Sequence, residues 1–145
     1  MTSTRKKAPR RADSELNRAP GMWGRRLARL IGAKWGVKMS SNRALNEGMH
    51  GRTPIVIKCA KSTGAPIQVS KATLERVGEV WGVFLSETDS APVWRLSASE
   101  FKRVASFYSP RNGTAHYQIR YKRFTREAEL IGTVASEEVE GVEIP

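Results

Sequence analysis

Apolar residues recur at helical spacing in three stretches of the chain. The longest lies within residues 20–34, where Arg25, Arg26 and Arg29 fall off the apolar stripe. That stripe is formed by Trp23, Leu27, Leu30 and Ile31. Shorter helices are predicted after Ser70 and Ser97, because a serine hydroxyl can accept a hydrogen bond from the first turn of a helix.

Other stretches have the composition or the alternation of strands. The predicted strands span residues 34–40, 53–60, 80–85, 93–96 and 116–124. The order of elements is then α-β-β-α-β-β-α-β, which predicts an α/β fold with a mixed central sheet flanked by helices. We expect Trp94 and Phe124 to lie in its core.

Charge divides the chain into regions. The net charge is +11, yet residues 127–145 hold six Glu and no Lys or Arg, which leaves 25 basic and 8 acidic residues, a net +17, in residues 1–126. We therefore expect a disordered basic tail over 1–13, one nucleic-acid-binding domain over 14–132, and a disordered acidic tail over 133–145. A basic surface of this strength favours a nucleic-acid partner.

Cysteine and histidine are too few for several classes of site. One Cys allows no internal disulfide, and one Cys with two His argues against a zinc set or a Ser-His-Asp triad. No apolar run is long enough for a transmembrane helix, and no apolar stretch follows the basic N-terminus as a secretory signal requires. We expect a reducing, cytoplasmic location.

Lys58 stands inside the predicted strand 53–60, where it shares a face with Val56 and Ala60. A buried ammonium without a partner costs several kcal/mol, so a partner is expected. A hairpin could bring Glu47 beside it, and Gln68 follows near the start of the next helix. The alternative is that Lys58 extends along the edge of the sheet into solvent.

These residues carry a resemblance to a known superfamily. Asn46-Glu47, then Val56-Ile57-Lys58, then Gln68 before a helix are similar to the pattern of the PD-(D/E)XK nuclease-like superfamily, whose fold is restriction-endonuclease-like, over about residues 20–125. The resemblance implies a metal-dependent endonuclease. In it Glu47 would bind Mg²⁺, Lys58 would stabilise charge developing on the phosphate, and Gln68 would lie near the metal.

Val56 departs from that pattern, because the superfamily has a second acidic residue at this position. Two interpretations stay open. Glu75 or Glu79 on the next helix supplies the missing carboxylate, or the fold binds DNA without cleaving it. We therefore predict a DNA-binding protein of nuclease-like fold. A metal-dependent phosphodiesterase, a non-catalytic or regulatory nucleic-acid-binding protein, and a basic module for an acidic protein are the alternatives.

The phosphate contacts are expected from basic residues in the tail, the first helix, the loop 109–116 and the last predicted strand. The candidates are Arg5, Lys6, Lys7, Arg10, Arg11, Arg25, Arg26, Arg29, Arg111, Arg120, Lys122 and Arg123. Tyr117 and Tyr121 either stack on bases or belong to the core. We expect DNA rather than RNA as the partner, and no association with a membrane. Assembly into a homodimer is one of the alternatives for the chain. The acidic tail is expected to cover the basic face when no ligand is bound.

Overall fold

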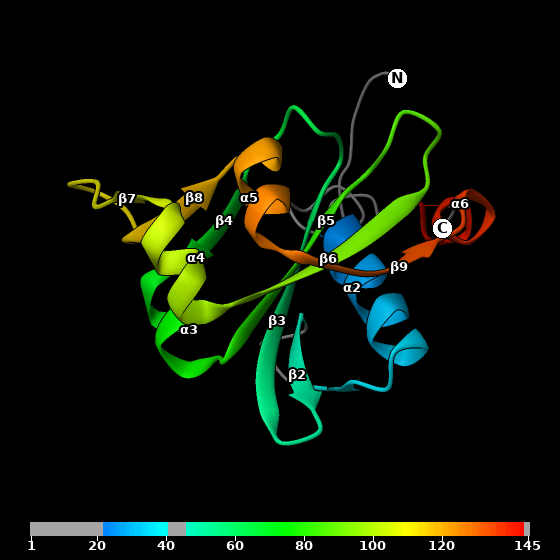
Figure 1. Ribbon diagram of the computed structural model, residues 1–145, viewed down its shortest axis with the longest axis horizontal. Coiled ribbons are helices and arrows are strands. Elements are labelled where there is room, and N and C mark those ends of the chain that lie inside the picture. The colour runs from blue at the N-terminus through cyan, green and yellow to red at the C-terminus, as the bar shows by residue number, and fades with distance from the viewer. Residues whose placement is uncertain (1–21, 41–45, 144–145) are drawn as a thin grey trace, which may run out of the picture.

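The computed structural model describes residues 22–40 and 46–143 (Figure 1). Its elements are α2 (Met22–Lys34), β1 (Lys38–Met39), β2 (Glu47–His50), β3 (Thr53–Ala60), β4 (Ile67–Ser70), α3 (Lys71–Arg76), β5 (Glu79–Phe84), β6 (Ala91–Ser97), α4 (Ala98–Val104), β7 (Ser106–Tyr108), β8 (His116–Ile119), α5 (Tyr121–Glu127), β9 (Glu129–Val134) and α6 (Ser136–Glu143). None of the described helices is long and apolar enough to cross a membrane.

The predicted mixed sheet is confirmed. A six-stranded sheet has the order β1-β2-β3-β5-β6-β9, and a three-stranded sheet has the order β4-β8-β7. In the larger sheet β3 and β5 run parallel and the other neighbours run antiparallel. The chain crosses from β3 to β5 through β4 and α3, because parallel neighbours cannot be joined by a tight turn.

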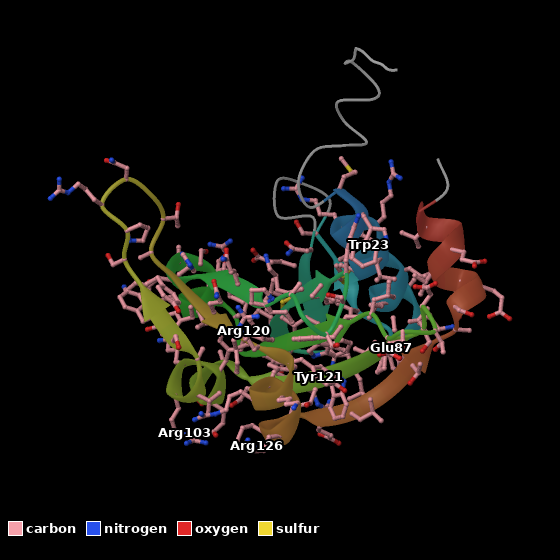
Figure 2. All side chains as sticks on the ribbon, turned by 90° about the horizontal axis from the view of Figure 1, so that it is seen from above. Trp23, Glu87, Arg103, Arg120, Tyr121 and Arg126 are labelled. Atoms are coloured by element: carbon pink, nitrogen blue, oxygen red, sulfur yellow. The ribbon has the colours of Figure 1, made fainter. Side chains whose placement is uncertain are left out.

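Each face of the larger sheet has its own core. On one face, α2 and α6 pack against β3, β5 and β6, with Leu27, Ile31 and Trp81 almost fully buried. On the other face, α3, α4, α5 and the smaller sheet pack around Val56, Phe84 and Phe124. Figure 2 shows the same division, with α2 and α6 on one side of the sheet and α5 on the other. Phe124 is confirmed as a core residue, whereas Trp94 is only partly buried.

Two predicted helix starts are confirmed, and in both the serine side chain makes the expected hydrogen bond. Ser70 Oγ accepts from Thr73 N, and Ser97 Oγ accepts from Glu100 N, both at 3.1 Å. These bonds satisfy N–H groups that have no partner within the helix. The first of these helices ends at Arg76, because the apolar run that follows forms β5, as predicted.

The predicted strand 116–124 is wrong in its second half. The alternation holds through Ile119, where β8 ends, and Tyr121 begins α5. Phe124 is buried on the helix and contacts the sheet over Gly82, where a Cβ would lie 2.5 Å from the Phe124 ring. On the helix, Phe124 joins the apolar core on this face of the sheet.

Residues 133–143, the described part of the segment expected to be an acidic disordered tail over 133–145, form the end of a strand and a helix instead. β9 continues to Val134, and α6 packs on α2 with Val139 only 1% exposed. Burial of Val134 and Val139 explains why this stretch folds with the domain despite its charge. The domain therefore does not end at residue 132. The basic tail, 1–13, and the boundary at 14 lie outside the described residues.

Candidate nucleic-acid interface

Lys58 lies in the middle of the larger sheet, on the face that holds Val56 and Ala60. Its register partner on β5 is Gly82, where Phe124 and Ile67 occupy the space that a side chain would need. The half-buried Lys58 stem therefore runs through apolar surroundings. Its ammonium makes no hydrogen bond or ion pair with the residues that the structure describes.

Burial lowers the pKa of Lys58 below its ordinary value, because an ammonium loses hydration in the protein. The positive charge of Arg25 lowers the Lys58 pKa further, while the fields of Cys59 and Glu47 act in the opposite direction. The neighbouring Cys59 is partly buried on the opposite face of the strand, and desolvation of its thiol raises the Cys59 pKa to about 12. Cys59 is thus protonated and inert near neutral pH.

Glu47 begins β2 and lies opposite Val56, so the predicted hairpin does bring it to the face that carries Lys58. Its carboxylate, however, forms an ion pair with Arg76 at the end of α3. Arg76 Nε donates to Oε1 at 3.0 Å, and Nη2 donates to Oε2 at 2.6 Å. This bidentate bond raises the pKa of Arg76. Glu47 is thereby matched by a guanidinium rather than by Lys58, which lies diagonally across the strand pair.

The residues around Glu47 do not fit Mg²⁺. Hard divalent cations need several oxygen ligands, and Val56 faces Glu47 where a second carboxylate would stand. Glu79 accepts a hydrogen bond from the Trp81 indole, and its strand position places it on the other face of β5. Glu75 pairs with Lys71 on the surface of α3. Within the described parts of the chain, no three His, Cys, Asp or Glu side chains gather into a metal-binding group.

Gln68 does not join Glu47 and Lys58, which corrects its expected place in the site. It lies in β4, between Ile67 and Val69, which point into the core. Strand alternation therefore turns Gln68 outward, where Nε2 donates to Gln118 Oε1 at 2.8 Å. Gln68 belongs to the outer face of the smaller sheet.

The three predicted arginines of α2 have different surroundings. Arg25 is exposed. Arg26 and Arg29 are half-buried and engaged within the protein, and Arg29 Nη1 donates to the carbonyl of Ser40 at 2.7 Å. Sequence reasoning missed Lys61, which is exposed with its ammonium 5.4 Å from the centre of the Trp23 ring. This cation–π contact joins the end of β3 to the start of α2, and no local pattern in the sequence indicates it.

The second group of basic residues surrounds α5. Arg120, Lys122 and Arg123 are exposed, as is Arg126, which sequence reasoning missed. Arg111 is exposed in the connection between β7 and β8. In Figure 2 this connection and α2 project to the same side of the sheet, whereas Arg126 lies on the opposite side. Arg5, Lys6, Lys7, Arg10 and Arg11 lie outside the described residues.

No protein-family model matches the chain, and no curated protein matches it. Among solved structures, the chain is similar to the Holliday junction resolvase Hjc of Archaeoglobus fulgidus, an archaeal hyperthermophile. The TM-score is 0.46 and the sequence identity 11%, over 81% of this chain and 95% of the resolvase. A likeness at this level does not extend to function.

Proposed function

We propose that the chain is a DNA-binding protein that contacts phosphates through exposed arginine and lysine and does not cleave DNA at Glu47 and Lys58. The observation that carries this proposal is that exposed basic side chains outnumber the acidic side chains available to pair with them. Carboxylates of Glu47, Glu75, Glu100, Glu129 and Glu138 each pair with a neighbouring Arg or Lys. Ten exposed cations make no salt bridge within the described residues, against four exposed carboxylates in the same condition, Glu87, Asp89, Glu137 and Glu140. The cations are Arg25, Lys38, Arg52, Lys61, Lys102, Arg111, Arg120, Lys122, Arg123 and Arg126.

Unpaired, exposed cations attract a polyanion because binding releases the counterions condensed on its phosphates. Affinity for a duplex should therefore fall steeply with salt. If about six phosphates are neutralised, log K should change with log salt with a slope near −5. Fluorescence anisotropy with a labelled duplex measures this slope. A salt-independent affinity would reject phosphate contacts.

The affinities for two further ligands distinguish the alternative partners, an acidic protein and RNA. Poly-glutamate of similar charge should bind more weakly than DNA, and an equal or higher affinity would favour an acidic protein as the partner. A duplex RNA of the same sequence tests the expected preference for DNA. Sedimentation of the complex reports whether the chain binds as a homodimer.

A metal-dependent phosphodiesterase remains the second candidate, because Glu47 and Lys58 do share one face of the hairpin. Supercoiled plasmid incubated with the chain and Mg²⁺ or Mn²⁺ distinguishes the two functions. We expect the plasmid to stay supercoiled, since Glu47 is bound by Arg76 and faces Val56. Nicking that disappears in Lys58→Met would instead support the nuclease.

A further inference from the structure

A cleft of about 260 Å³ opens between α4, β7, β8 and α5, away from Glu47. Its walls combine two arginines, neutral polar groups, one aromatic ring and a small apolar floor. The lining residues are Val104, Ser106, Tyr108, Gln118, Ile119, Arg120 and Arg123. No carboxylate is among them, so the positive charge at the cleft is not neutralised by its own lining.

The two arginines differ in how much of their hydrogen-bonding capacity is used inside the protein. Arg120 Nη1 donates to the carbonyl of Gly64 at 3.0 Å, which fixes the guanidinium against the loop between β3 and β4 and leaves other N–H groups. Arg123 is exposed and makes no hydrogen bond or ion pair within the described residues. A fixed and a free guanidinium at one cleft suit a phosphate, whose oxygens accept paired N–H donors.

Tyr108 supplies an aromatic surface beside this charge. Its ring stacks on His116 with centroids 5.5 Å apart and planes inclined by 24°. The residue is nevertheless 46% exposed, so ring surface remains for a second stacking partner. Gln118 Oε1 accepts from Gln68, and this fixes the Gln118 amide so that its own N–H groups remain available as donors.

We propose that this cleft holds one unpaired nucleotide of a bound DNA strand, with its phosphate at Arg120 and Arg123 and its base against Tyr108. The inference rests on the proposed function and adds a preference for single-stranded segments. A base inside a duplex is stacked on its neighbours and offers no free face to Tyr108.

Binding of an oligothymidylate of about 12 nucleotides tests the proposal in the full chain. Arg123→Gln should weaken it about tenfold, through loss of a charge-assisted hydrogen bond. Arg103→Gln is the matched control, because Arg103 is an exposed arginine that pairs with Glu100 and lies outside the cleft. Thermal unfolding of both variants checks that the fold is kept.

A second substitution separates base from phosphate. Tyr108→Leu should weaken oligothymidylate about tenfold through loss of stacking and leave an abasic oligomer of equal length unaffected. Arg123→Gln should weaken both ligands. Equal effects of Arg123→Gln and Arg103→Gln, or of Tyr108→Leu on both oligomers, would overturn the nucleotide site. If the wild type binds duplex but no single strand, this inference fails and the proposed function stands; if it binds neither, both fail.

Discussion

Two regions of the molecule use positive charge in opposite ways. Beside the β2–β3 hairpin, Lys58 is half-buried among apolar residues, and Arg76 is held by both oxygens of Glu47. At the cleft beside α5, Arg123 is exposed and no carboxylate lines the walls. In the first region the charge of Arg76 joins two elements of the fold and the charge of Lys58 is half-buried, whereas the second region leaves charge available for a ligand.

The difference teaches that neighbours decide the chemistry of a residue more than its place in a motif. Glu47 stands where the nuclease-like pattern has a metal ligand, but α3 brings Arg76 to it from 29 positions along the chain. A carboxylate that accepts a bidentate guanidinium has little capacity left for a cation. The arginines of α5, outside any motif, have the open surroundings that an anion needs.

The largest effect is expected from a substitution that detaches α5 from the sheet, because the cleft depends on this helix. Phe124 is fully buried and contacts the ring of Phe84 and the backbone of Gly82. Phe124→Ala should lower the free energy of unfolding by about 3–5 kcal/mol, because it removes buried apolar contact and leaves a cavity. Urea unfolding followed by tryptophan fluorescence measures this loss.

Lys122 provides the matched control on the same helix, since its side chain is exposed. Lys122→Ala should change the free energy of unfolding by less than about 0.5 kcal/mol. If Phe124→Ala costs under about 1 kcal/mol, then α5 is not anchored by this ring and the geometry of the cleft loses its basis.

Local signals predicted much of the fold. The stripe of α2, the serines before α3 and α4, and the apolar strands β3 and β5 all lie within a few residues of where they were expected. The smaller sheet was missed, because β4 and β7 are short and gain their stability from pairing with β8. Phe124 breaks the alternation of residues 116–124, and this was the available sign of a helix.

The candidate site was less predictable, because its decisive contacts join distant parts of the chain. The hairpin that places Glu47 and Lys58 on one face follows from local pattern. The bond from Arg76 to Glu47 depends on how α3 crosses the sheet, and no spacing encodes it. The cleft combines residues from four elements, one of which was not predicted as a helix.

The role of the Glu47–Arg76 pair can be tested next. The Glu47 side chain is 16% exposed, so Arg76→Met leaves a largely buried carboxylate without its bidentate partner. We expect a loss of about 2 kcal/mol in the free energy of unfolding, the cost of an unsatisfied buried group. Arg103→Met is the control, because its partner Glu100 is 45% exposed and the pair is worth about 1 kcal/mol or less. Equal losses would contradict a special role for Glu47.

The smallest expected effect concerns Lys58. Because burial lowers its pKa, the folded chain binds fewer protons than the unfolded chain between the folded pKa and the ordinary lysine value of 10.5. Stability should therefore rise with pH across that window, and the cost of the buried charge is fully present below it. Lys58→Met keeps an apolar stem of similar length and should raise the free energy of unfolding at pH 7 by about 1 kcal/mol.

The gain should shrink as pH approaches 10.5, where the wild-type ammonium also loses its proton. Urea unfolding at several pH values measures this trend, with Lys61→Met as the exposed control that changes stability little. Duplex affinity should be nearly unchanged in Lys58→Met, since the proposed phosphate contacts lie elsewhere. A tenfold loss of affinity, about 1.4 kcal/mol, with stability unchanged would instead make Lys58 a ligand-binding residue and reverse the contrast between the two regions.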